Sequence, residues 1–265
     1  MPKVINFKSF ADAAKDPASC TEFGYLEPLD MNYFGMGRSE NLHLAICAVH
    51  AFRDAEGRYP CDNAADLTKV VDLCKGINVA NKESGGINLE EIDETICKNV
   101  AAYSTCSITS QAAFFGGFVA QEIVKFTGKY MPLKQWAHYD CFESLPEGPV
   151  NREPMNCRYD DQIKIYGRET QEKLGAVKTF MIGAGALGCE YAKAFAMMGL
   201  GCGPTGSVTV TDNDNIEVSN LNRQFLFRQP DVGSSKAETA CRKAKIMNSD
   251  LKVTTHVAFV APETE

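Results

Sequence analysis

One glycine motif constrains the fold of this 265-residue chain more than any other feature. Gly183, Gly185 and Gly188 form a G-x-G-x-x-G pattern, which follows the apolar run 177–182 and precedes the apolar run 187–198. In nucleotide-binding folds the first such glycine permits a tight turn, the second lets a ligand approach the backbone, and the third lets helix pack on strand. The motif therefore predicts a strand, a ligand-binding loop and a helix, in that order.

Strand and helix patterns continue to alternate after this motif, which is typical of a parallel sheet. We expect a strand over 207–211, a helix over about 235–247 and a strand over 252–260. With the motif, these elements predict one β-α-β-α-β half of a doubly wound α/β fold. Such folds normally contain a second half, so we also expect the complete sheet to need strands beyond Glu265.

The first hundred residues show helical patterns instead. Apolar residues recur at three-and-four spacing over 42–52 and again over 67–77, and Gly57 and Pro60 predict the end of the first of these helices. Residues 1–106 are therefore expected to form an antiparallel helical bundle, in which no acid, base and nucleophile converge.

Capping residues predict where two of these helices begin. Ser39 is a candidate N-cap for the first helix. Asn88, with Glu91 three residues later, is the corresponding candidate for a third helix. Residues 81–86 are expected to form the loop before it.

A different kind of helix is predicted over 107–127. This segment is apolar nearly all round and is followed by Gly128, so we expect it to be buried on several sides. A short strand over 135–142 and a polar linker over 143–158, rich in turn formers, are expected next. The predicted domains are thus residues 1–106, 107–150 and 151–265.

Composition excludes several classes of function. The net charge of −7 argues against a nucleic-acid partner, and the lack of a long apolar run argues against a membrane span. The first twenty residues lack the apolar core of a signal peptide. No two of the eleven cysteines form a C-x-x-C pair, so no metal site is expected, and the cysteines are interpreted as buried thiols in a reducing compartment.

Polar residues after the second strand are the candidate ligand-binding groups. Asp212 ends that strand, where a carboxylate can accept hydrogen bonds from both ribose hydroxyls, and Asp214 is a second candidate. An acid at this place fits an adenosine nucleotide but does not separate NAD from ATP.

Cations further along favour a triphosphate. Attack of a carboxylate on an α-phosphate accumulates negative charge, so the site needs fixed cations, and Arg223 and Lys236 can supply them as the candidate catalytic groups. Asn220 and Gln224 can add neutral hydrogen bonds to the phosphates.

Longer stretches of the chain resemble a known family. The stretches YDDQIKIYG, MIGAGALGCE, TDNDNIEVSNLNRQFLFR and DVGSSKA resemble the catalytic adenylation half of ubiquitin-activating enzymes. The stretch SQAAFFGGFVAQEIVKFTGKYMPLKQW is similar to a piece of that family's noncatalytic half, and the helices before it resemble its four-helix-bundle insertion. The resemblance implies a Rossmann-like, ThiF/MoeB-like adenylation half-domain preceded by a helical bundle.

The resemblance also implies a reaction and roles for individual residues. Ala186 would lie against the nucleotide beside Gly183 and Gly185, Asp212 would hold the ribose, and Arg223 and Lys236 would contact the phosphates. In that family MgATP adenylates the C-terminal carboxylate of ubiquitin. The modifier is then captured as a thioester on a cysteine, which here would lie outside the chain, as would a magnesium-associated aspartate.

Ubiquitin and ubiquitin-conjugating enzymes are the partners that this resemblance implies, and cytoplasm and nucleus the compartments. The isolated chain is expected to be inactive. Two alternatives stay open at this point: an NAD-dependent Rossmann oxidoreductase, which shares the glycine motif and Asp212, and a non-catalytic scaffold.

Overall fold

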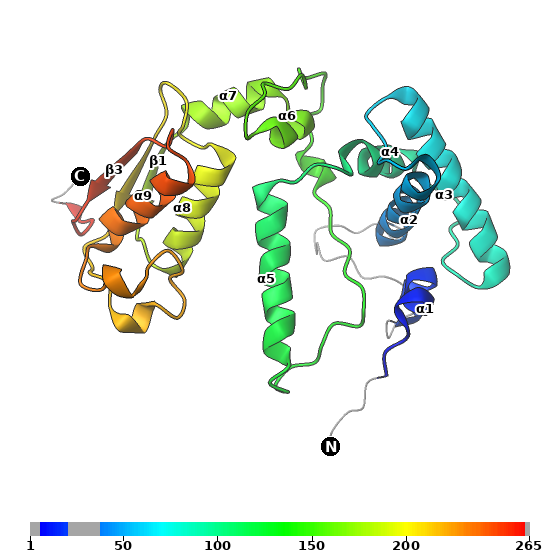
Figure 1. Cartoon of the computed structure of the whole chain (residues 1–265), viewed down its shortest axis with the longest axis horizontal. Coiled ribbons are helices and arrows are strands. Elements are labelled where there is room, and N and C mark those ends of the chain that lie inside the picture. Colours follow the sequence, from blue (N-terminus) through cyan, green and yellow to red (C-terminus); the bar gives the residue numbers. More distant parts are fainter. Residues whose placement is uncertain (1–5, 21–37, 263–265) are drawn as a thin grey trace. The chain divides into compact units, whose positions relative to one another are not determined.

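The computed structural model describes residues 6–20 and 38–262, which divide into two compact units. One unit comprises Met1–Cys106 with Gly116–Leu145, and the other comprises Ser107–Phe115 with Pro146–Glu265. We call them the helical unit and the α/β unit (Figure 1). The break after Leu145 lies inside the segment 143–158 that the sequence predicts to be a linker.

Three helices form the core of the helical unit. Helices α2 (Arg38–Glu56), α3 (Ala64–Ser84) and α4 (Glu94–Tyr103) pack against one another. The bundle prediction is therefore confirmed for these helices. The unit also contains α1 (Phe10–Lys15) and the short 3-10 helices η1 (Pro17–Cys20) and η2 (Phe142–Ser144). Large buried side chains fill the space between the three main helices: Leu44, Val49, Phe52, Val70 and Val71.

Both predicted helix starts in this unit are wrong. Ser39 lies inside the first turn of α2, and α4 begins after Asp93, whose side chain accepts hydrogen bonds from the amides of Thr95 and Ile96. The side-chain amide (Nδ2) of Asn88 instead donates to the carbonyl oxygen of Asn78, so this side chain does not cap a helix. Helix α3 also continues to Ser84, four residues into the expected loop.

Two further expectations for this part of the chain are wrong. Helix α5 (Thr109–Lys125) forms as predicted, but none of its residues is buried, because no other described element packs extensively on it. Residues 135–142 form no strand, apart from a single bridge residue at His138.

The α/β unit contains a parallel sheet in the order β1-β2-β3. Strand β1 (Lys178–Ile182) pairs with β2 (Ser207–Thr211), with Ile182 opposite Thr211, and β2 pairs with β3 (Val253–His256), with Thr211 opposite His256. The connections are α8 (Ala186–Met198) and α9 (Lys236–Met247). This arrangement confirms the α/β fold class and the predicted element order, although β3 ends four residues earlier than expected.

Two short helices precede the sheet, α6 (Asp160–Tyr166) and α7 (Arg168–Ala176). Neither helix is predicted from the sequence. Gly167 between them has a positive φ of 87°, so it ends the first helix without the steric cost that another residue would meet.

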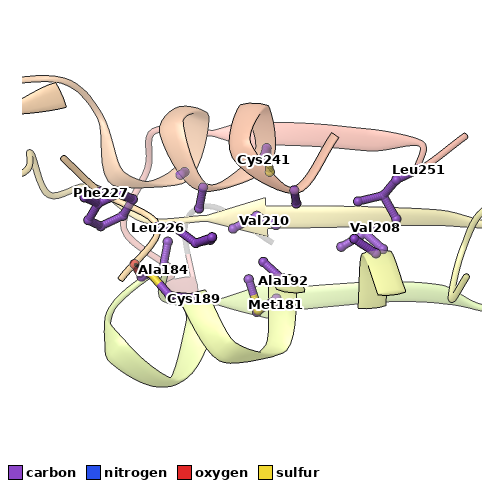
Figure 2. Packing of buried hydrophobic residues seen from close by; sticks show 14 of the residues in the cluster. Met181, Ala184, Cys189, Ala192, Val208, Val210, Leu226, Phe227, Cys241 and Leu251 are labelled. Carbon is purple, nitrogen blue, oxygen red and sulfur yellow. Dashed lines mark hydrogen bonds between the residues drawn. The ribbon is translucent and has the colours of Figure 1, made fainter. Parts of the chain in front are cut away.

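Small side chains form much of the core between the sheet and its helices. Figure 2 shows Met181 of β1 and Val210 of β2 packed with Ala192 of α8 and Cys241 of α9. Because Ala192 and Cys241 have small side chains, both helices can lie close to the strands. No helix in the described ranges 6–20 and 38–262 is long and apolar enough to cross a membrane.

Candidate functional site

The glycine loop joins the end of β1 to the start of α8. Gly183 has φ +94°, and a Cβ at Gly183 would meet no atom within 4 Å, so the loop surface is open on that side. A Cβ at Gly188 would lie 2.3 Å from the carbonyl oxygen of Gly183, which explains why the third glycine is needed for close packing. No side chain caps the helix at Gly185, so the first amides of α8 keep their donors for a ligand.

Asp212 follows β2 and lies beside this loop. Its Oδ2 accepts a hydrogen bond of 2.7 Å from the amide of Ala184, and its Oδ1 accepts one of 2.8 Å from the amide of Asp214. Each carboxylate oxygen has a second lone pair, so Asp212 can still accept hydrogen bonds from ribose hydroxyls. The structure thus brings the predicted ribose acid and the predicted phosphate loop together at the carboxyl ends of neighbouring strands, where α/β folds bind ligands.

Lys236 is the first residue of α9 and is almost fully buried. Its Nζ lies 2.7 Å from Oδ2 of Asp214, and its amide donates to the carbonyl oxygen of Asp214 at 3.0 Å. The neighbouring Ser235 caps the helix, as the predicted start at residue 235 requires. Asp214 therefore holds Lys236 at the base of the loop that connects β2 to α9, and the exposed Asp214 carboxylate balances its charge.

Gln224 is the least satisfied polar residue in this loop. Its side chain is only 4% exposed, and its Oε1 is buried without a hydrogen-bond partner. Its Nε2 lies 3.8 Å from where a Cβ of Gly185 would be, so the amide faces the glycine loop. An unpaired buried carbonyl costs about 1–3 kcal/mol, which a donor such as a ribose hydroxyl or an adenine amino group can recover. Phosphate oxygens only accept, so they can bond to Nε2 of Gln224 and not to Oε1.

Asn220 and Arg223 differ from Gln224 in their surroundings. Oδ1 of Asn220 accepts a hydrogen bond of 2.9 Å from the amide of Glu217, so Asn220 closes a turn of the loop itself. Arg223 is exposed, and its guanidinium donates to the carbonyl oxygen of Ser219 at 2.9 Å. Among the described residues no carboxylate pairs with Arg223, so its charge remains available to an anion.

The cysteines near the glycine loops are packing residues. Cys189 is buried in the α/β core, and burial raises the pKa of its thiol. Burial likewise raises the pKa of Cys202. A raised pKa keeps a thiol protonated and poorly nucleophilic, in agreement with the interpretation of these residues as structural. In the part of the chain that the structure describes, no three histidine, cysteine or acidic side chains gather as a metal site.

One buried acid near the site was not singled out by the sequence. Asp231 lies in the 3-10 helix η4 (Gln229–Asp231) and contacts two cations of α9. In the sequence it is only one of several acids in a polar loop, and nothing there indicates that it is buried.

Two family models match the chain, each over one part. The model of the ThiF family matches residues 159–265, and the model of the ubiquitin-activating enzyme E1 four-helix bundle matches residues 1–78. The first match covers the sheet and the glycine loop, and the second covers α2 and most of α3. Among solved structures, Escherichia coli TcdA in complex with ATP is 28% identical over 40% of this chain and 42% of that chain, with a TM-score of 0.37.

Curated relatives match the chain from end to end. Ubiquitin-like modifier-activating enzyme 1 of Oryctolagus cuniculus is 39% identical over 100% of this chain and 25% of its own length. Ubiquitin-activating enzyme E1 1 of Schizosaccharomyces pombe is 41% identical over 100% of this chain and 26% of its own length. The chain spans about a quarter of the length of these relatives. Because identity near 40% spans the whole of this chain and two family models match parts of it, the chain belongs to the ubiquitin-activating enzyme family.

Proposed function

We propose that this chain supplies the nucleotide-binding half-site with which an enzyme of this family uses ATP to adenylate the C-terminal carboxylate of ubiquitin. The observation that carries the proposal is the meeting of four features at one edge of the sheet. These are an open glycine loop, the Asp212 carboxylate bonded to it, the buried Gln224 amide that faces it, and Lys236 at the base of the same β2–α9 loop.

Each group has a distinct part in the proposed reaction. The free amides at the start of α8 and the space at Gly185 accept the phosphates, and Asp212 orients the ribose. The ubiquitin carboxylate attacks the α-phosphorus and pyrophosphate leaves. Lys236 and Arg223 stabilise the negative charge that grows on the phosphates. Magnesium would act as a counter-ion of the triphosphate, and we assign it no protein ligand in this chain.

Nucleotide binding changes the environment of Lys236 in this proposal. Without nucleotide its Nζ pairs with Asp214, which is exposed and therefore well solvated. A triphosphate carries more charge than one carboxylate, so it can attract Lys236 away from Asp214 at a small cost.

The remaining expectations of the sequence extend the proposal. Transfer of ubiquitin to a cysteine, the encounter with ubiquitin-conjugating enzymes, and activity in cytoplasm and nucleus would belong to the longer protein. The NAD-dependent oxidoreductase alternative shares the glycine loop and Asp212, but it offers no reason for identity near 40% to ubiquitin-activating enzymes over the whole chain.

The test is ubiquitin-dependent ATP–pyrophosphate exchange by a full-length enzyme that contains this chain, with the isolated chain assayed beside it. We expect exchange by the enzyme and none by the isolated chain. Asp212→Ala and Lys236→Ala should each remove most of the exchange, because each deletes a ligand contact, while circular dichroism shows an intact fold.

Lys245→Ala is the matched control, since Lys245 lies on the same helix but is exposed. It should leave exchange unchanged. Wild-type exchange in either site variant would remove that residue from the site, and tight NAD binding without exchange would support the oxidoreductase instead.

A further inference from the structure

Asp231 ties the β2–α9 loop to the helix that follows it. Its Oδ1 lies 2.8 Å from the guanidinium of Arg242, and its Oδ2 lies 3.3 Å from Nζ of Lys243, both on α9. Oδ2 also accepts a hydrogen bond of 2.9 Å from the amide of Arg228. Burial alone raises the pKa of Asp231, but the hydrogen bonds from Arg242, the Arg228 amide and Lys243 outweigh it and hold the pKa below its ordinary value. The carboxylate is therefore a charged clamp between loop and helix.

Hydrogen bonds also connect Arg228, whose amide Asp231 holds, to Gln224. The guanidinium of Arg228 donates to the carbonyl oxygens of Phe225 and Phe227, and the amide of Phe227 donates to the carbonyl oxygen of Gln224 at 3.0 Å. The amide of Gln224 in turn donates to the carbonyl oxygen of Asn220 at 2.9 Å. Hydrogen bonds from the Arg228 side chain and from the loop backbone thus connect the residue held by Asp231 to the candidate phosphate-binding residues.

Backbone hydrogen bonds also join the two ends of the β2–α9 loop in the segment between Asp231 and Lys236. The amide of Gly233 donates to the carbonyl oxygen of Ile216 at 2.8 Å, and the amide of Ile216 donates to the carbonyl oxygen of Ser234 at 2.9 Å. Lys236 begins α9 two residues later. Asp231 consequently lies between the segment that carries Gln224 and the segment that carries Lys236. Its carboxylate contacts Arg228, Arg242 and Lys243 but, among the described residues, no residue of the glycine loop.

We propose that Asp231 is a positioning residue for the nucleotide site: by clamping the β2–α9 loop to Arg242 and Lys243, it holds Gln224 and Lys236 in the arrangement that binds the phosphates of ATP. The inference rests on the proposed function. A loop that is fixed before ATP arrives loses less conformational entropy on binding than a loop that ATP must order, so the clamp contributes to affinity without touching the ligand.

The experiment measures steady-state pyrophosphate exchange by the full-length enzyme carrying Asp231→Asn. The substitution keeps the shape of the side chain and an acceptor for the Arg228 amide but removes the charge that holds Arg242 and Lys243. We expect KM for ATP to rise about tenfold with kcat within about twofold of wild type, because a tenfold change corresponds to about 1.4 kcal/mol, the size of one hydrogen bond to a charged group. Asp231→Glu, which restores the charge, should recover part of the affinity.

A buried acid in the helical unit provides the matched control. Asp66 pairs with Arg58 with side-chain exposures of 9% and 48%, close to the 9% and 55% of Asp231 and Arg242. Asp66→Asn should lower the melting temperature and leave KM for ATP unchanged. Arg242→Gln, at a half-exposed position, should raise KM about threefold and keeps the test available if Asp231→Asn does not fold.

The outcomes separate this inference from the proposed function. Wild-type exchange with an unchanged KM in Asp231→Asn and Arg242→Gln, measured below their melting temperatures, would overturn the positioning role alone. An equal rise of KM in Asp66→Asn would overturn it too, because a general loss of stability would then explain the effect. No exchange by the wild-type enzyme would overturn the proposed function first.

Discussion

Asn78 in the helical unit and Gln224 in the α/β unit are buried to similar degrees, yet their hydrogen bonds differ. Asn78 donates to the carbonyl oxygen of Leu89 and accepts from the amide of Leu89, both at 2.8 Å, so its side chain is satisfied within the unit. Oε1 of Gln224 has no partner. The comparison of these two residues indicates that Asn78 stabilises the fold of its own unit, whereas Gln224 keeps a buried polar group for a ligand. Nε1 of Trp136 and Nδ1 of His138 in the helical unit are likewise buried without a partner among the described residues.

The two cores also differ in the size of the side chains that their helices bury. Leu44 and Phe52 fill the helical core, whereas Ala192, Ala240 and Ala244 line the helices over the sheet. Large side chains bury more apolar area, while alanines let α8 and α9 lie close to the sheet. The α/β unit should therefore be the more sensitive of the two to an added methyl group.

The strongest test of that difference is Gly188→Ala. Its Cβ would lie 2.3 Å from the carbonyl oxygen of Gly183, so the backbone must move, and we expect the α/β unit to lose more than about 4 kcal/mol of stability. Hydrogen exchange measured by mass spectrometry should show loss of protection in β1 and α8 with protection in α2 and α3 retained.

Gly185→Ala is the control for this substitution. A Cβ there meets nothing closer than 3.8 Å, so the fold should persist while ATP binding weakens. Equal protection of β1 in Gly188→Ala and in the wild type would contradict the argument from close packing.

Acid should act on the helical unit through a buried histidine pair. Nδ1 of His43 and Nε2 of His138 lie 3.1 Å apart, and burial, together with repulsion from His43, lowers the pKa of His138 from 6.5 to about 4. The unfolded chain binds a proton at His138 more readily than the folded chain does. The free energy of unfolding therefore has its full value above about pH 6.5 and decreases as the pH falls towards 4. The loss should approach about 3 kcal/mol, measured by denaturant unfolding of the helical unit across that range.

His138→Gln should flatten the acid limb of the pH profile, which is the fall of the free energy of unfolding between about pH 6.5 and 4, because glutamine does not titrate. His50→Gln, at an exposed position on the same helix as His43, should leave the limb as in the wild type. An unchanged limb in His138→Gln would assign the acid sensitivity to other groups.

The smallest effects test the difference between Asn78 and Gln224 directly. Asn78→Ala breaks two buried hydrogen bonds and leaves the backbone of Leu89 unpaired, so it should cost about 2 kcal/mol in denaturant unfolding. Gln224→Met removes an unpaired oxygen and keeps the side-chain length, so stability should stay within about 1 kcal/mol of wild type while ATP affinity falls. A large loss of stability in Gln224→Met would show that this residue, too, serves the fold.

The features of this molecule that could be predicted are those that depend on the local pattern of residues. The strand over 207–211 and the start of a helix at about residue 235 follow from the alternating strand and helix patterns, and both are observed. That Ser235 caps this helix is seen only in the structure. Helices α6 and α7 have 7 and 9 residues, too few to show a clear helical period, so they escaped prediction. The start of α4 was misplaced because Asn88 and Asp93 are both good caps, and only the contact of Asn88 with Asn78 decides between them.

The sequence by itself determined the order of elements and the glycine loop, because each depends on residues close together in the chain. The position of Asp212 beside the loop depends also on the parallel pairing of β1 with β2, since Asp212 and Ala184 are 28 residues apart. Tertiary structure alone decided burial and the pairing of polar groups. Only the structure shows that α5 remains exposed, that Asn220 closes its own turn, and that Asp231 joins its loop to α9. Burial and long-range hydrogen bonding depend on segments that meet only after folding, so residue type and spacing cannot specify them.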